Sequence, residues 1–322
     1  MPNGNYTYIT NVSRTGSISG DPQNAAIGNY VLLTAAYNEE ANIEKTIHAV
    51  LSQTVLPQRW VIVSDGSTDQ TDEIVQRYVA SNPFIHFLRI TRFPGRSFGS
   101  KVKALHAGLE LLNGVPFTHL GNLDADVTVA PTYFADLLLQ FQKQPRLGIA
   151  AGFVCEESGG EFTSRRSNRT YSVPHAAQLV RRDCYEAIGG YAVLEYGGED
   201  WHAQTSARMM GWEAVAFPEL PILHHRPTGE ADNLLRYRFR QGRMDFSFGS
   251  DPLFELFKCL DRALEKPLVV GGLARFAGFL WAGICRDHRP VSKEFIAFLR
   301  QEQSHRLRWL ITGPIRKKAS AS

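Results

Sequence analysis

Cysteine, excess charge of one sign and long uncharged apolar runs are all scarce in this chain of 322 residues. Its four cysteines, Cys155, Cys184, Cys259 and Cys285, lie far apart without a C-x-x-C pair, which argues against a zinc site and a disulfide framework. The formal net charge of +3 is too small for a dedicated nucleic-acid binder. Because 43% of the residues are hydrophobic, we expect a folded globular protein, and the scattered cysteines favour a reducing compartment.

Two common phosphate-binding loops are also missing. No G-x-G-x-x-G follows the first apolar run, and Gly99-Ser100-Lys101 does not complete a Walker A sequence. Residues 1–28 are polar and contain no apolar core of a signal peptide, so we predict a disordered leader there. These absences remove the simplest nucleotide-binding folds and a secretory route from consideration.

The first half of the chain alternates short β-branched apolar runs with stretches of helical spacing. Strands are predicted for Tyr30 to Ala36, Trp60 to Ser64, Ile85 to Ile90, Phe117 to Leu123 and Leu147 to Val154. Helices are predicted for Ala41 to Gln53, Thr71 to Ala80, Ser100 to Leu112, Arg181 to Ile188 and Glu199 to Met210, with an aperiodic polar loop from Glu156 to Thr170. This order predicts an α/β fold with a Rossmann-like, doubly wound, mostly parallel sheet, whose ligands lie at the carboxyl ends of the strands.

A D-x-D triplet, Asp124-Ala125-Asp126, directly follows one predicted strand. Two carboxylates on extended backbone can serve a diphosphate complex, one of them by ligating a hard cation. We expect Asp126 to face solvent at the strand tip. The alternative is that these are turn acids, or that one of them caps a helix opened by Pro131.

The two preceding strands also end in acidic residues. After the second strand, Ser67 and Gln70 form a capping-box pattern, which leaves Asp65 at the strand tip to accept hydrogen bonds from a base or ribose. The first strand runs into Ala36-Tyr37-Asn38-Glu39-Glu40, which can also be explained by an Asn cap and acids in a first helical turn.

Taken in order, the segments AYNEE, VSDGSTD, GSKVKALHAG and NLDADV resemble the N-terminal half of the family 2 glycosyltransferases, which have the GT-A fold. Gly189-Gly190-Tyr191, Gly198-Glu199-Asp200 and Gly211-Trp212 are similar to that family's second half. The resemblance therefore extends from about Tyr30 to Trp212. Four ordered motifs at compatible spacing are far more specific than any one of them.

The resemblance implies an inverting transfer of a sugar from a nucleotide-sugar donor, most often a UDP-sugar, to a saccharide or lipid-linked saccharide, with Mn²⁺ or Mg²⁺ as cofactor. It assigns the nucleotide-sugar site to Ala36, Tyr37, Glu39, Asp65, Lys101, Asp124 and Glu199, the metal to Asp126 with Asp124 as a second ligand, and the catalytic base to Asp200. A single base without a second nucleophilic carboxylate favours direct displacement at the anomeric carbon.

Three further positions bear on this resemblance. His224 lies where relatives often carry a metal or diphosphate ligand, and His225 competes for that role. A His pair at a strand end can instead be a satisfied polar terminus. The chain departs from the family where His202 replaces a common acid and Arg208 is offset from the usual Arg position.

Beyond a glycosyltransferase domain at 29–228, residues 229–322 are predicted to be helical. They contain an apolar segment, 267–285, that is interrupted by Arg275 and followed by nine Lys or Arg against three Asp or Glu up to Lys318. This composition suits a helical appendage peripheral to the inner face of the cell membrane, or a helical subdomain packed on the core. The rival functions are a sugar nucleotidyltransferase and a non-catalytic nucleotide-sugar-binding protein; a nucleic-acid partner is not expected.

Overall fold

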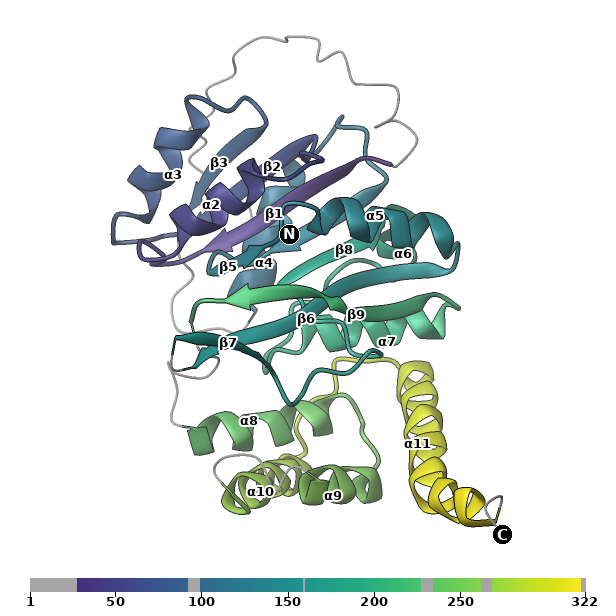
Figure 1. The fold of residues 1–322 in the computed structure, drawn as a ribbon. Coiled ribbons are helices and arrows are strands. Elements are labelled where there is room, and N and C mark those ends of the chain that lie inside the picture. Colours follow the sequence, from purple (N-terminus) through teal and green to yellow (C-terminus); the bar gives the residue numbers. More distant parts are fainter. Residues whose placement is uncertain (1–27, 92–98, 159, 227–233, 262–267, 320–322) are drawn as a thin grey trace. The chain divides into compact units, whose positions relative to one another are not determined.

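The computed structural model describes residues 28–91, 99–158, 160–226, 234–261 and 268–319 (Figure 1). These residues form two compact units. The first comprises the described residues up to Glu195 and those from Glu199 to Arg226, and the second comprises Tyr196 to Gly198 and the described residues from Leu234 on. The predicted leader lies outside the described residues, apart from Gly28.

The first unit alternates strands and helices from Tyr30 to Leu123, as its apolar patterns predict, and adds further strands after that. Its strands are β1 (Tyr30–Ala36), β2 (Arg59–Asp65), β3 (Ile85–Ile90), β4 (His119–Leu123), β5 (Val127–Val129), β6 (Leu147–Ser158), β7 (Glu161–Ser164), β8 (Ala177–Arg181) and β9 (Glu213–His224). Its helices are α2 (Ile43–Leu51), α3 (Thr71–Val79), α4 (Ser100–Glu110), α5 (Tyr133–Lys143), α6 (Arg182–Ala187) and α7 (Glu199–Met209). The expected α/β class is confirmed.

The strands described here join in one nine-stranded sheet in the order β3-β2-β1-β4-β8-β6-β9-β5, with β7 paired to β6. The part formed by β3, β2, β1 and β4 is parallel, as is the pair of β6 and β9. Strands β8, β5 and β7 run antiparallel to their neighbours. The parallel part brings the carboxyl ends of β1, β2 and β4 to one edge of the sheet, which positions the loops analysed below.

Alternating residues of the parallel strands fill two apolar layers, one on each face of the sheet. On one face, Leu32 and Ile62 belong to a cluster that includes residues of α2, α3 and α5. On the other, Leu33 and Val63 pack with Leu105 of α4. Burial on both faces explains why these strands read as nearly continuous apolar runs.

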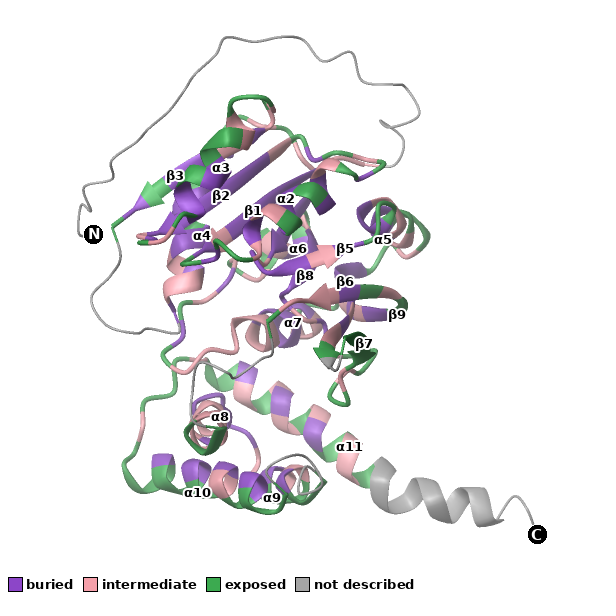
Figure 2. Cartoon of the chain, turned by 60° about the vertical axis from the view of Figure 1, so that its left-hand side comes forward, coloured by how far each residue is buried: buried purple, intermediate pink, exposed green. Residues whose placement is uncertain are grey.

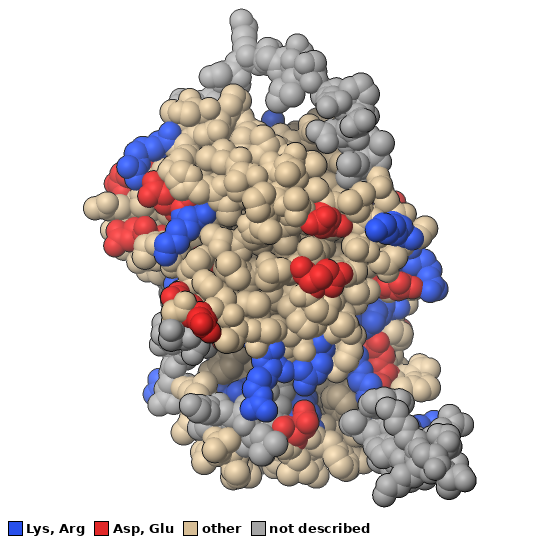
Figure 3. Space-filling view, viewed as in Figure 1, with Lys and Arg blue, Asp and Glu red and all other residues tan. Residues whose placement is uncertain are grey.

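On the surface, acidic and basic side chains lie interspersed on the face drawn in Figure 3.

Two local expectations were wrong. The segment from Glu156 to Thr170 is not an aperiodic loop throughout, because Cys155 to Ser158 pairs with β7 in an antiparallel hairpin. The capping box of Ser67 and Gln70 is not formed either. The hydroxyl of Ser67 lies 3.1 Å from the Ser64 hydroxyl, and Gln70 N, the amide that the box would satisfy, donates to Glu40 Oε2 at 3.0 Å instead. The first amide of α3, Thr71 N, donates to Asp69 Oδ1 at 3.0 Å.

The second unit is helical in its described residues. It contains α8 (Leu234–Ser247), α9 (Pro252–Asp261), α10 (Val270–Ile284) and α11 (Lys293–Ala319). None of the helices in the described part of the chain is long and apolar enough to cross a membrane. Within the apolar segment predicted at 267–285 lies α10, a helix of 15 residues, about three quarters of the roughly 20 residues that a bilayer requires.

Candidate active site at the carboxyl ends of the strands

The loops after β1 and β2 are held together by reciprocal hydrogen bonds. Asn38, whose φ of 53° is unusual for a residue other than glycine, accepts from Thr68 N at 2.8 Å through its side chain. Glu39 N donates to the Thr71 hydroxyl at 2.7 Å, and Gln70 N donates to Glu40 at 3.0 Å. Asn38 therefore braces the neighbouring loop, and the expected Asn cap on α2 is absent because α2 begins at Ile43 with Asn42 before it.

This bracing places three of the predicted nucleoside contacts along one edge of the sheet. Ala36 is the last residue of β1 and is buried, and Tyr37 follows it with 39% of its surface exposed. Asp65 is the last residue of β2, in register with Ile90, and is buried. An exposed ring and a carboxylate at the ends of two neighbouring parallel strands suit a nucleoside, and these assignments stay predictions.

Lys101 and Asp124 form an ion pair that joins α4 to the end of β4. The Lys101 Nζ to Asp124 Oδ1 distance is 2.5 Å, and Asn122 donates to the same oxygen at 3.2 Å. Burial by itself would lower the pKa of Lys101, but the charges of Asp124 and Glu199 outweigh it and raise that pKa. Lys101 therefore remains a cation among carboxylates, as a phosphate-binding lysine must.

A second group gathers Glu39, Asp126, His224 and Arg226 from three distant segments. Arg226 Nη2 lies 2.6 Å from Glu39 Oε1 and 2.9 Å from Asp126 Oδ2. His224 Nε2 lies 3.4 Å from the other oxygen, Asp126 Oδ1. The expectation that Asp126 faces solvent was wrong, since it is only 4% exposed beside His224 and Arg226.

Glu39 is the most strongly perturbed carboxyl of this group. Burial, and then the charge of Asp126, raise its pKa from 4.5 to about 7, although Arg226 opposes the change. Two carboxylates close together without full compensation make an additional cation favourable between them. The group therefore carries negative charge that a bound cation would relieve.

The two candidate histidines point to different partners. The His224 side chain approaches the Asp126 carboxylate, whereas the His225 Nε2 lies 2.9 Å from the Thr128 hydroxyl. The His225 ring also makes a T-shaped contact with Phe162, with 5.5 Å between the ring centroids. Burial lowers the pKa of His225. The structure thus favours His224 over His225 as the partner of Asp126.

At the start of α7, Glu199 and Asp200 have unlike environments. The pKa of Glu199 would rise through burial, but His175, whose Nδ1 lies 3.6 Å from Glu199 Oε1, and Lys101 hold it at about 2. Burial and the charge of Glu199 raise the pKa of Asp200. Asp200 Oδ1 also accepts a hydrogen bond from Trp201 N at 2.7 Å. Two adjacent carboxyls with separated pKa values suit one ionised, positioning group and one base.

A divalent cation is compatible with the residues at Asp126. No group of three or more His, Cys, Asp and Glu in the described residues is arranged to hold a metal without further ligands. Asp126 and His224 nevertheless offer a carboxylate and an imidazole side by side, a donor pair that suits Mn²⁺. A cation that retains phosphate or water ligands needs only one or two such protein groups. The donor set therefore fits a metal shared with a diphosphate.

Arg226, His175 and Asn122 were missed by the sequence-based reasoning. Arg226 directly follows the His pair, and that adjacency was the only available signal. His175 carries no motif, and Asn122 begins the NLDADV segment but was given no role. They are buried, and Asn122 donates to the backbone carbonyl of His175. His202 and Arg208, the two departures from the family pattern, lie in α7, where Arg208 donates to Thr205 at 3.1 Å.

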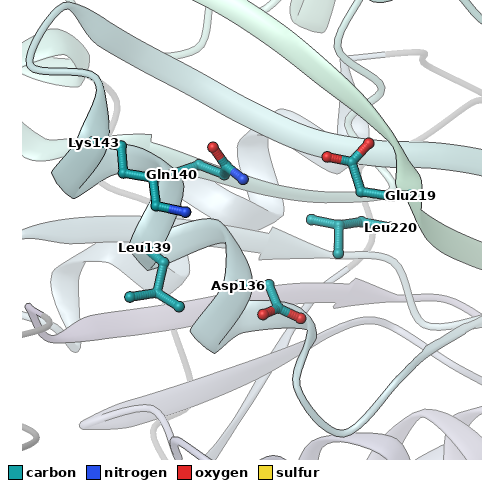
Figure 4. A pocket seen from close by; sticks show the side chains of 6 residues that line it. All are labelled: Asp136, Leu139, Gln140, Lys143, Glu219 and Leu220. Carbon is teal, nitrogen blue, oxygen red and sulfur yellow. The ribbon is translucent and has the colours of Figure 1, made fainter.

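A separate hollow of about 290 Å³ lies between α5 and β9. Figure 4 shows its lining, with Asp136, Leu139, Gln140 and Lys143 on the helix and Glu219 and Leu220 on the strand. None of the predicted site residues lines it. The strand-end cluster therefore remains the candidate site.

A comparison with protein families decides among the possible functions. Residues 32–195, about half the chain, match the family model for glycosyl transferase family 2. The chain belongs to that family. The match begins within β1 and ends in the segment before α7, and therefore includes Glu39, Asp65, Lys101, Asp124 and Asp126. The protein is a glycosyltransferase, and the nucleotidyltransferase and non-catalytic alternatives are set aside.

Relatives and solved structures agree with this membership. A poly-β-1,6-N-acetyl-D-glucosamine synthase of Staphylococcus aureus is 32% identical over 123 residues, which are 37% of this chain and 27% of that protein. The chain thus spans about a quarter of that relative's length. A mannosyltransferase from Pyrobaculum calidifontis in complex with GDP-Man and Mn²⁺ superimposes with a TM-score of 0.52 at 17% identity, covering 87% of this chain and 81% of that one.

Residues 1–349 of TarS from Staphylococcus aureus, in complex with UDP-GlcNAc, give a TM-score of 0.51 at 12% identity, covering 84% of this chain and 78% of that chain. At such low identity these likenesses establish the fold alone. They confirm the predicted GT-A architecture of this family 2 glycosyltransferase. The roles of the individual site residues stay predictions.

Proposed function

We propose that this glycosyltransferase transfers a sugar from a UDP-sugar to a hydroxyl of a saccharide or lipid-linked saccharide, with inversion at the anomeric carbon and with Mn²⁺ or Mg²⁺. The observation that carries the proposal is the pair Glu199 and Asp200, in which one carboxyl is held ionised and its neighbour is made more basic. Lys101 interacts electrostatically both with this pair and with Asp124. The base and the phosphate-binding groups therefore belong to one site.

Asp200 is the proposed general base. Its carboxylate takes the proton of the acceptor hydroxyl while that oxygen forms a bond to the anomeric carbon and the bond from that carbon to the diphosphate oxygen breaks. The raised pKa of Asp200 makes it a better proton acceptor at neutral pH. Glu199, with its pKa near 2, keeps its charge and maintains that shift. With a single base and no nucleophilic carboxylate, the acceptor oxygen displaces the diphosphate directly, which implies inversion at the anomeric carbon.

The second group of residues, near the ends of β1 and β4, is proposed to stabilise the leaving diphosphate. Lys101 supplies a fixed positive charge beside Asp124, and Asp126 with His224 would hold the cation. When bound, that cation stabilises negative charge on the leaving phosphate oxygens. Arg226 now contacts the same carboxylates, Glu39 and Asp126, and keeps them in place.

The donor and the site of action are further parts of the proposal. UDP-GlcNAc is the first donor to test, because the Staphylococcus aureus relative is named as a synthase of an N-acetylglucosamine polymer and TarS was solved with UDP-GlcNAc. All four cysteines are free thiols, which is compatible with a reducing cytoplasm. We accordingly place the reaction in the synthesis of a polysaccharide or glycolipid, on the cytoplasmic side.

The experiment starts with a panel of nucleotide sugars, with Mn²⁺ or with a chelator, scored by protection from thermal unfolding. The donor that protects is then used to compare wild type with Asp200→Asn. We expect the substitution to lower turnover by roughly two to four powers of ten while donor affinity changes little, as for loss of a general base.

Asp183→Asn is the matched control, because Asp183 is an exposed acid in the first turn of α6 and its loss should leave turnover unchanged. Loss of donor affinity at unchanged turnover would instead assign Asp200 to binding. A product that retains the donor's anomeric configuration by NMR would reject the inverting mechanism. Failure of every nucleotide sugar to protect the protein would reject the donor class.

A further inference from the structure

Helices α9 and α10 of the second unit place charged side chains inside the unit and apolar side chains on its surface. Arg275, the only charged residue of α10, is buried, with its Nη2 2.5 Å from Asp245 Oδ2 and its Nε 3.1 Å from Glu255 Oε1. Glu255, in the first turn of α9, is fully buried too. Lys258 reaches inward to Asp245 at 2.7 Å. Both helices therefore turn charged groups toward the interior of the unit, where water-soluble helices normally place apolar ones.

The opposite sides of these helices are apolar and exposed. Each helix carries a stripe with helical spacing, and we call the two stripes together the α9–α10 apolar face: Leu253, Phe257 and Leu260 on α9, and Leu273, Leu280 and Ile284 on α10. Their exposed fractions run from 43% to 76%. In Figure 2, exposed residues line the outer sides of both helices, away from α8. Large apolar side chains exposed together along two packed helices mark an interaction site.

The orientation of α10 is fixed by its packing on α8. A Cβ atom on Gly278 would collide with the Phe239 backbone, and one on Gly242 would collide with the Arg275 backbone, so the two helices are in close backbone contact. Arg275 adds a hydrogen bond to Gln241 of α8 at 3.0 Å. Rotating α10 to hide its apolar stripe would break these contacts and expose Arg275. The exposure is therefore built into the unit.

The charges beside this face indicate what covers it. Arg286, Arg289 and Lys293 are exposed just after α10. Of the two acids in this stretch, Asp287 is already paired with Arg243 at 2.8 Å, and Glu294 lies in the first turn of α11, so the stretch carries a net positive charge. A second copy of the chain would bring like charges together at this place. An anionic lipid surface offers both an apolar layer and opposite charge. A helix of 15 residues, about 22 Å long, is too short to span a bilayer but can lie in its interface.

We propose that the α9–α10 apolar face docks the protein on an anionic lipid bilayer, with both helices lying in the headgroup region and Arg286 and Lys293 at the headgroup phosphates. Trp281, 52% exposed on α10, is suited to the boundary between headgroups and acyl chains. This docking does not depend on transferase activity, so it is tested without a donor.

The test is sedimentation of the full chain with vesicles of phosphatidylcholine alone or with 30% phosphatidylglycerol, at low and high salt. We expect wild type to bind the anionic vesicles and to be released by salt. Leu273→Glu with Leu280→Glu should lower the partition coefficient at least tenfold, and Leu253→Glu with Leu260→Glu should do the same from α9. The control is Leu56→Glu with Leu139→Glu, which adds equal charge at exposed leucines of the first unit and should keep binding within about twofold.

Two further readouts separate docking from mere loss of structure. Arg286→Gln and Lys293→Gln should each weaken binding to anionic vesicles roughly fivefold, without affecting the fold measured by circular dichroism. Brominated lipids should quench the fluorescence of Trp281 in the wild type. The quenched fraction of the tryptophan emission should therefore disappear in Trp281→Phe. The proposal is overturned if wild type stays in the supernatant with anionic vesicles at low salt, or if the control loses binding as strongly as the test variants. It is equally overturned if wild type is a dimer that Leu273→Glu with Leu280→Glu converts to a monomer.

Discussion

Replacing Glu39 by Gln should stabilise the first unit at alkaline pH. Glu39 is 7% exposed, and its pKa is raised to about 7 by burial and by Asp126. The folded protein therefore binds a proton at Glu39 that the unfolded chain has already released, between pH 4.5 and about 7. Because the folded state holds more protons in that window, its stability falls as pH rises through it. A neutral amide of the same shape removes the dependence and still accepts from Arg226.

The size of the effect follows from the same shift. Each tenfold change in proton affinity corresponds to about 1.4 kcal/mol, so the change from 4.5 to about 7 corresponds to about 3 kcal/mol once Glu39 is ionised. Glu39→Gln should thus gain about 3 kcal/mol over wild type at pH 8 and about 1 kcal/mol at pH 5. For a domain of this size, the gain at pH 8 raises the melting temperature by roughly 5–10 °C.

The assay is thermal unfolding of the full chain at pH 5, 6, 7 and 8, with a chelator present, because a bound cation would itself shift a nearby carboxyl. Glu40→Gln is the matched control, since Glu40 is the adjacent carboxyl but is exposed and accepts its hydrogen bond from Gln70. The reasoning is refuted if Glu39→Gln is no more stable than wild type at pH 8, or if Glu40→Gln gains as much.

Two other substitutions test the metal site and the second unit. Asp126→Asn should abolish most of the Mn²⁺-dependent binding of UDP while the fold persists, since the amide is a poor metal ligand; equal affinities in calorimetric titration would defeat the assignment. Arg275→Leu should destabilise the second unit by roughly 3 kcal/mol in urea unfolding, because Asp245 and Glu255 would lose a buried partner. Exposed Arg286→Leu serves as control, and an equal loss there would contradict the buried-pair argument.

The sequence alone determined the strands and helices from β1 to β4 and the edge of the sheet where the candidate site residues lie. Strands β1 and β3 occupy the predicted residues, because buried parallel strands leave continuous apolar runs. Asp65 and Asp124 were found because each directly follows such a run. The ends of parallel strands meet at one edge, so the topology brings those residues together without any information on side-chain contacts.

The partners of those residues were decided only by the tertiary structure. Arg226 reaches Glu39, 187 positions earlier in the chain, and Asn38 braces a loop 30 positions away instead of capping its own helix. Such pairs leave no periodic trace in one sequence, because each depends on how distant segments pack. The same holds for Arg275. Its place in an apolar run was visible, but only the packing of α8, α9 and α10 turned it inward and left leucines outside.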